Sequence, residues 1–229
     1  IDTGVTGIAY ETVTSSDGSM PLLAPMSTIA GQLAFVVGSY HLLKHNKGKG
    51  VMIGHMDDMD PRVVTVIGAG VAGTQSILKA IDNKALVKVV DSSQSKLDDL
   101  KSKYGTENVE YILSSKDSIQ VSVNESDLVI GSVYVVGKEA PKVVTKDMLS
   151  SMNPGTVMVD VSIDQGGCFE SSKPTTHDNP TFLENDIVHY CVTNMPGAVP
   201  LTATQALNKV TLSYICLLYT SDAADDNRC

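Results

Sequence analysis

Apolar residues recur with two different periods along the chain. Over residues 27–44 they follow the 3.6-residue spacing of a helix, and Ser27 stands where an N-cap is expected. After Pro61, short runs rich in Val and Ile alternate with amphipathic segments. The runs predict strands at 63–67, 87–90, 108–113, 127–130, 156–161 and 187–192, and the segments predict helices at 73–81, 95–103 and 202–215.

Short, continuously apolar strands separated by helices indicate a parallel sheet that is covered on both faces. The predicted fold is α/β, with a Rossmann-type doubly wound domain over residues 26–200. Residues 1–25 differ from it, with turn signals and a strand-like run at 8–13. Residues 217–229 show no periodicity and resemble translated sequencing-adapter text, so we interpret them as a non-native tail.

Composition narrows the class of protein. Of the 229 residues, 42% are hydrophobic and 19% are charged, which is typical of a globular domain with a sizeable core. The net charge of −9 argues against a surface that neutralises nucleic-acid phosphates. No apolar stretch reaches the roughly 18 residues that a membrane span needs. We therefore expect neither a nucleic-acid nor a membrane partner.

The four cysteines form no C-x-x-C pair and have no regular spacing. This pattern argues against a disulfide framework and against a structural zinc site, and it predicts reduced thiols in the cytoplasm. His41 and His45 lie four residues apart, as two ligands on one helix face would, but no third ligand is evident. No metal site is expected.

The stretch 63-VVTVIGAGVAG-73 runs from a predicted strand into a predicted helix. In a dinucleotide-binding loop, Gly68 would permit the tight turn, Gly70 would let backbone approach a diphosphate, and Gly73 would allow close helix–strand packing. Asp91 follows the next predicted strand, roughly 20 residues on, where a carboxylate accepts the ribose hydroxyls of NAD and repels the extra phosphate of NADP. The sequence predicts an NAD site; a plain glycine turn with a casually placed Asp is the alternative.

Four longer stretches are more specific than the glycine loop. These are 4-GVTGIAYETV-13, 21-PLLAPMSTIAGQLA-34, 160-DVSIDQGGCFESSKPTTHDNPTF-182 and 191-CVTNMPGAVPLTAT-204. Together they resemble the bacterial alanine dehydrogenase family, whose relatives include proton-translocating nicotinamide nucleotide transhydrogenases. The resemblance covers residues 1 to about 215, and the run 163-IDQGG-167 favours the dehydrogenases.

The resemblance implies a cytoplasmic, NAD-dependent enzyme that interconverts L-alanine with pyruvate and ammonium in alanine catabolism, usually as a homohexamer. It also implies a second, substrate-binding domain of which only remnants are present. Residues 1–25 would end its first segment, residues 27–44 would be the connecting helix, and residues 201–216 would return to it. The chain begins with Ile1 rather than Met, so we interpret it as a fragment lacking both ends.

Asp164 matches the family's catalytic aspartate, where it would orient a water molecule or stabilise a developing cation. Without the flanking Ile-Asp-Gln-Gly-Gly it would be interpreted as a turn or helix-cap acid. Besides the three glycines and Asp91, the match places further residues at the cofactor: Ser27, Val71, Ala72, Lys96, Ser114, Val133, Tyr134, Val161, Ser162, Ile163, Asp164 itself, Val192, Thr193, Asn194 and Met195. Simpler interpretations are a helix cap for Ser27 and an exposed helix lysine for Lys96.

The sequence departs from the family's pattern in two ways. Lys173 stands where the family often has Arg, and Lys lacks the bidentate geometry of Arg. The family's catalytic histidine and the Arg and Lys that hold the substrate carboxylate lie upstream of Ile1 in its pattern. We therefore expect this chain to bind NAD better than it turns over alanine. Two alternatives stay open: an NAD(H)-binding transhydrogenase subunit and a non-catalytic NAD-binding module.

Overall fold

The computed structural model of the protein describes residue 4, residues 7–135 and residues 138–225. Packing divides the chain into two compact units. One consists of Ile1–Thr28 with Pro196–Cys229, and the other of Ile29–Met195. The second unit contains the predicted strands, and each unit is described by itself.

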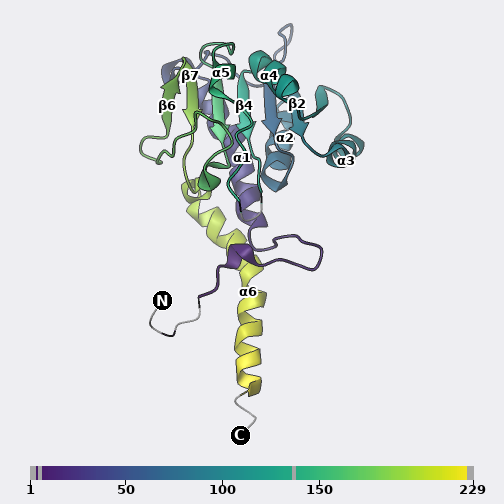
Figure 1. The fold of residues 1–229 in the computed structure, drawn as a ribbon, viewed down its shortest axis with the longest axis vertical. Coiled ribbons are helices and arrows are strands. Elements are labelled where there is room, and N and C mark those ends of the chain that lie inside the picture. The colour runs from purple at the N-terminus through teal and green to yellow at the C-terminus, as the bar shows by residue number, and fades with distance from the viewer. Residues whose placement is uncertain (1–3, 5–6, 136–137, 226–229) are drawn as a thin grey trace. The chain divides into compact units, whose positions relative to one another are not determined.

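In the second unit, the described residues form a seven-stranded sheet (Figure 1). The strands lie in the order β3-β2-β1-β4-β5-β7-β6, and every neighbouring pair is parallel except β6 and β7. Their bounds are β1 (Val63–Ile67), β2 (Leu86–Asp91), β3 (Val109–Leu113), β4 (Leu128–Gly131), β5 (Val157–Asp160), β6 (Thr181–Glu184) and β7 (Ile187–Tyr190). The predicted doubly wound α/β fold is confirmed.

In the described chain, one helix precedes these strands and four connect them. They are α1 (Ala24–His41), α2 (Val71–Asp82), α3 (Gln94–Tyr104), α4 (Lys116–Glu125) and the short α5 (Lys146–Leu149). Helix α1 lies so close to α2 that a Cβ built on Gly31 would fall 2.0 Å from the carbonyl oxygen of Ala72. The hydroxyl of Ser76 on α2 donates to the carbonyl oxygen of Gly31 at 2.7 Å. The glycine therefore lets the two helix backbones touch.

Both faces of the sheet are buried, because successive residues of each central strand enter different cores. On β4, Leu128 and Ile130 join the core that includes Phe35 of α1 and Ile77 of α2. Val129 between them joins the core that contains Ile119 of α4. The strand order reverses between β1 and β4, so the carboxyl ends of these strands border the crevice in which doubly wound sheets bind ligands.

The prediction of a strand at the strand-like run 8–13 is wrong. The structure has a 3-10 turn, η1 (Tyr10–Thr12), in which the amides of Thr12 and Val13 donate to the carbonyl oxygens of Ala9 and Tyr10. The hydroxyl of Thr12 also donates to Ala9. Local hydrogen bonds satisfy this segment, so the strand preference of its residues has no neighbouring strand to act on.

Helix α1 begins at Ala24, and Ser27 is not its N-cap. The amide of Ala24 donates to the carbonyl oxygen of Met20, and that of Ser27 donates to Leu23, so the backbone is already helical there. Pro25 fits this first turn, where its missing N–H costs nothing. The helix ends at His41 rather than Lys44, and a separate 3-10 turn, η2 (Lys44–Asn46), follows.

Helix α6 (Pro200–Asp225) is longer than expected. It runs past residue 217, where we predicted an aperiodic tail, because no Gly or Pro follows Pro200 to break it. The end of that tail, residues 226–229, lies outside the described residues. Across the part of the chain that the structure describes, no helix combines the length and apolar character needed to cross a bilayer.

Candidate cofactor and active site

The glycine loop follows β1, and two of its glycines are required by their surroundings. Gly68 has a φ of 96°, and a Cβ there would meet the carbonyl oxygen of Ser132 at 2.6 Å. A Cβ at Gly73 would lie 1.8 Å from the carbonyl oxygen of Gly68. A side chain at Gly70 would instead meet nothing within 4 Å. The loop thus packs tightly on one side and faces open space at Gly70.

That open space belongs to a cavity of ≈ 420 Å³. It is lined by Ala69, Gly70, Val71, Thr74, Gln75, Lys96, Asp99 and Leu100. Helix α2 starts at Val71, and its N-cap, Gly70, has no side chain to occupy the first free N–H groups. Free amides at a helix N-terminus attract phosphate, so the loop and cavity fit the diphosphate of a dinucleotide.

Asp91 is the last residue of β2 and is 7% exposed. Its Oδ2 accepts a hydrogen bond from the amide of Ala69 at 2.7 Å, and its Oδ1 accepts one from the amide of Ser93 at 2.8 Å. A carboxylate offers about four acceptor positions, so ribose hydroxyls can still be accepted. The structure therefore adds a second role to the predicted one: Asp91 holds the glycine loop.

Two other predicted cofactor residues lie near this carboxylate. Lys96, in the first turn of α3, lines the cavity beside the glycine loop. Ser114 follows β3, and its amide donates to the carbonyl oxygen of Asp91 at 2.9 Å. Strands β2 and β3 thus bring both residues to the adenosine side of the predicted site.

Hydrogen bonds of the residues that follow β4 connect the glycine loop to the chain that follows β5. The hydroxyl of Ser132 donates to the carbonyl oxygen of Gly68 at 2.7 Å. The hydroxyl of Ser162, after β5, donates to the carbonyl oxygen of Val133 at 2.8 Å. Tyr134, the next predicted cofactor residue, is 48% exposed. Ser132 was not predicted from the sequence, although it directly follows β4 and lies two residues beyond the strand predicted at 127–130.

Asp164 lies in the short 3-10 turn η3 (Ile163–Gln165) after β5, and it is exposed. Its carboxylate oxygens lie 3.4 and 3.5 Å from the backbone nitrogen of Asn194. Asn194 has a φ of 50° and lies beyond the end of β7. The structure therefore brings together two of the segments that we predicted around the nicotinamide.

Not every predicted residue of these segments can offer its side chain. Ile163, Val192 and Met195 are buried in the protein core, so only their backbone atoms remain for a cofactor. Val161 is partly buried, and its amide donates to Gly131. The amide of Thr193 donates to Thr175.

Ser27 belongs to the other compact unit, so its contact with the cofactor stays a prediction. Lys173 pairs with Glu184 at 3.0 Å and lies over the ring of Phe182. The pairing lowers the pKa of the Glu184 carboxyl.

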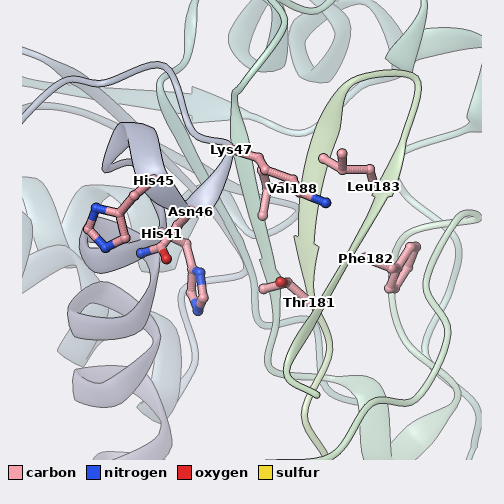
Figure 2. A pocket seen from close by; sticks show the side chains of 8 residues that line it. All are labelled: His41, His45, Asn46, Lys47, Thr181, Phe182, Leu183 and Val188. Atoms are coloured by element: carbon pink, nitrogen blue, oxygen red, sulfur yellow. The ribbon is translucent and has the colours of Figure 1, made fainter. Parts of the chain in front are cut away.

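A second cavity, of ≈ 230 Å³, lies between the end of α1 and the β6–β7 hairpin (Figure 2). His41 and His45 both line it, but His41 ends α1 and His45 lies in η2. Burial lowers the pKa of His41. Nowhere in the described chain do three His, Cys, Asp or Glu side chains gather as metal ligands would.

Asp160, the last residue of β5, is fully buried and was not predicted from the sequence as a site residue. Burial raises the pKa of its carboxyl, although four hydrogen bonds oppose that rise. The neighbouring Cys168 is buried as well, and burial followed by the negative charge of Asp160 raises the pKa of its thiol. A clue was present, because Asp160 ends an apolar run just as Asp91 does.

Comparison with known proteins agrees with this geometry. Residues 34–227 match the family model described as the alanine dehydrogenase/PNT, C-terminal domain. The chain is 49% identical to an alanine dehydrogenase of Halomonas elongata, over 95% of this chain and 58% of that protein. It is 47% identical to an alanine dehydrogenase of Mycobacterium tuberculosis, over 94% of this chain and 58% of that protein. The chain thus spans little more than half the length of these relatives.

Solved structures agree in the same way. An L-alanine dehydrogenase structure superposes with a TM-score of 0.89 at 43% identity, covering 93% of this chain and 59% of that one. A transhydrogenase from Sinorhizobium meliloti superposes with a TM-score of 0.73 at 22% identity, covering 84% and 55%, and it shows the shared fold alone. On the family match and the identity to its relatives, the chain belongs to the alanine dehydrogenase/PNT family.

Proposed function

We propose that this chain is the NAD-binding part of an NAD-dependent L-alanine dehydrogenase, which oxidises L-alanine to pyruvate and ammonium. One observation carries the proposal. A series of hydrogen bonds along the carboxyl edge of the sheet joins Asp91 to the glycine loop, that loop to the end of β4, and β4 to the turn of Asp164. We infer that a dinucleotide would lie along this edge, with its adenosine side at Asp91 and its nicotinamide toward Asp164.

The chain's own residues support NAD as the cofactor. The free amides at the start of α2 would hold the diphosphate, with Gly70 leaving room for it. The carboxylate of Asp91 would accept ribose hydroxyls and disfavour a 2′-phosphate. When bound, NAD supplies the hydride acceptor.

Asp164 would act beside the substrate carbon. Once a hydride has left Cα of alanine, the resulting imine needs water, and the carbinolamine formed must lose ammonia. An exposed carboxylate can orient that water and stabilise the positive charge on nitrogen. The amide of Asn194 would keep the carboxylate in place, because its hydrogen bonds reach both oxygens.

The activity requires the rest of the polypeptide. From the family resemblance we expect the catalytic histidine and the carboxylate-binding Arg and Lys to lie outside residues 1–229. We therefore propose that this chain binds NADH without turning over alanine, and that the full-length protein is a cytoplasmic homohexamer. Light scattering of the full-length protein tests the assembly.

The deciding experiment uses a longer polypeptide that contains this chain and has the full length of its relatives. With L-alanine and NAD it should produce NADH. Asp164→Asn should lower kcat by about a hundredfold, which is about 2.7 kcal/mol of barrier, with NADH affinity within about twofold. A kcat equal to the parent's would remove Asp164 from the chemistry.

The same experiment separates the alternatives. Exchange between NADPH and an NAD analogue without alanine turnover would favour a transhydrogenase subunit. NADH binding without either reaction would favour a non-catalytic module. Absence of NADH binding by the 229-residue chain would contradict the cofactor assignment itself.

A further inference from the structure

We propose that Asp160 is a positioning residue for the reaction, because its buried carboxylate anchors both ends of the loop that presents Asp164. The inference rests on the proposed function, since it gives Asp164 the catalytic role. Asp160 itself is fully buried and lies four residues before Asp164, so it acts through the loop and not on the substrate.

The first anchor is at the start of the loop. The Oδ1 atom of Asp160 accepts a hydrogen bond from the amide of Ser162 at 2.9 Å. The hydroxyl of Ser162 in turn donates to Val133 after β4. The chain that leaves β5 is therefore fixed to the end of β5 and to the loop that follows β4.

The second anchor is where the loop returns. The Oδ2 atom of Asp160 accepts hydrogen bonds from the amide of Cys168 at 2.9 Å and from that of Phe169 at 3.3 Å. The hydroxyl of Ser172 also donates to Oδ2. The thiol of Cys168, kept protonated because burial raises its pKa, lies 3.5 Å from Oδ1 as a weak donor. One carboxylate thus gathers donors from residues 162–172.

The turn between the anchors depends on two glycines. Gly166 and Gly167 have φ values of 85° and 78°, and a Cβ on Gly167 would lie 2.7 Å from Oδ2 of Asp160. The ammonium of Lys142 donates to the carbonyl oxygens of both glycines. The chain can therefore fold back tightly onto the carboxylate, which leaves Asp164 exposed at the outer side of the turn.

Charge explains why a carboxylate is needed. Each of these partners of Asp160 is a donor, and an ionised carboxylate is acceptor-only on both oxygens. An asparagine has the same shape, but its NH₂ group would face at least one backbone N–H in either orientation. Asp160→Asn should therefore loosen one end of the loop while leaving the side-chain volume almost unchanged.

The matched control is Asp127→Asn. Asp127 is also a buried aspartate on the sheet, but it precedes β4 at the opposite, amino edge. It accepts from the amide of Val63 at 3.2 Å and pairs with Lys49 at 2.9 Å. This variant also neutralises a buried carboxylate, one that accepts from a backbone amide and from an ammonium, without touching the loop of Asp164.

The first measurement is amide hydrogen exchange in the 229-residue chain, read by NMR, with no substrate present. Asp160→Asn should speed exchange at Ser162, Cys168 or Phe169 at least tenfold relative to the strands, and Asp127→Asn should not. Unchanged protection at all three amides in Asp160→Asn would overturn the anchoring role.

The second measurement is kinetic and uses the full-length polypeptide below the unfolding temperature of each variant. Asp160→Asn should lower kcat at least tenfold while KM for NAD stays within about threefold, and Asp127→Asn should change neither. An equal loss of kcat in both variants would overturn the proposal, because general destabilisation would then explain it. If the parent polypeptide does not oxidise alanine, the proposed function fails, whereas the exchange result still decides the anchoring.

Ser172→Ala keeps the test decisive if Asp160→Asn does not fold. It removes one side-chain donor and leaves the three backbone donors of Asp160 in place. We expect a kcat lowered about twofold to fivefold with an unchanged KM for NAD. A kcat equal to that of the parent would then overturn the proposal.

Discussion

Two loops at the carboxyl edge of the sheet are held by the same device, a strand-terminal aspartate that accepts backbone N–H groups. Asp91 of β2 holds the glycine loop through Ala69, and Asp160 of β5 holds the loop of Asp164 through Ser162 and Cys168. The difference is burial. Asp91 adjoins the predicted cofactor and keeps some exposure, whereas Asp160 has none. The first aspartate can both shape a loop and touch a ligand, and the second can only shape one.

The largest effect should follow removal of the fully buried carboxylate. Asp160→Ala leaves three backbone amides and the hydroxyl of Ser172 without their acceptor. Buried donors without partners cost about 1–3 kcal/mol each, so losing the acceptor of four donors should lower the free energy of unfolding by about 4 kcal/mol or more. Urea denaturation of the 229-residue chain measures this. A loss below about 1 kcal/mol would mean that water replaces the carboxylate easily, and the contrast with Asp91 would disappear.

The corresponding change at the glycine loop should appear mainly in binding. Asp91→Ala removes the proposed ribose acceptor and the acceptor for the amide of Ala69, so NADH affinity should fall about thirtyfold to a hundredfold, or about 2–2.7 kcal/mol. Titration of NADH fluorescence measures it. Asp98→Ala, an exposed carboxylate on α3, is the control and should bind NADH as the parent does. Parent-like affinity in Asp91→Ala would remove Asp91 from the site.

Substitutions at two glycines of one loop should affect different properties, one the stability of the fold and the other the binding of NADH. Gly68→Ala places a Cβ against Ser132 at a positive φ, so stability should fall by about 1–3 kcal/mol. Gly70→Ala should leave stability within about 0.5 kcal/mol, because its Cβ meets open space, but it should weaken NADH binding about tenfold. Thermal unfolding and NADH titration of both variants give the two numbers. Equal affinities for Gly70→Ala and the parent would place the diphosphate elsewhere.

The smallest effect should come from a single side-chain donor. Ser172→Ala should lower the free energy of unfolding by about 1 kcal/mol, since Asp160 keeps its backbone partners. Urea denaturation of Ser172→Ala and of Asp160→Ala under the same conditions measures the ratio of the two losses in stability. A loss as large as that of Asp160→Ala would mean that the hydroxyl, and not the backbone amides, holds the loop.

Local patterns predicted the central part of the fold well. Strand β1 occupies the predicted residues because an apolar run ends at a glycine there. Helix α4 was missed: its Val, Ile and Ser content disfavours a helix, and its capping box uses Ser118 where Glu or Gln would signal one. Strand β6 was missed because it is a short antiparallel strand at the edge of the described sheet, where it pairs with β7.

At the site too, local patterns predicted some contacts and missed those that depend on tertiary structure. Asp91 could be found from its spacing to the glycine loop, since the two are consecutive parts of one β-α-β unit. The partners of Asp160 return to it only through the turn at Gly166 and Gly167, and that return is a tertiary arrangement. At Ser27 a local signal was misleading. The sequence suggested an N-cap there, but hydrogen bonds to Met20 and Leu23 already start the helix earlier.

The hydrogen bond between Asp91 and the amide of Ala69 has a consequence for protein engineering. Switching such an enzyme toward NADP calls for replacing the ribose-binding acid by a neutral or basic residue, which accommodates the extra phosphate. In this protein that exchange would also remove the acceptor that holds the amide of Ala69 in the glycine loop, the segment proposed to bind the diphosphate. If Asp91 sets the cofactor preference as proposed, that preference is tied to the structure of the glycine loop, and a redesign must supply a new acceptor for the amide of Ala69 along with the new residue.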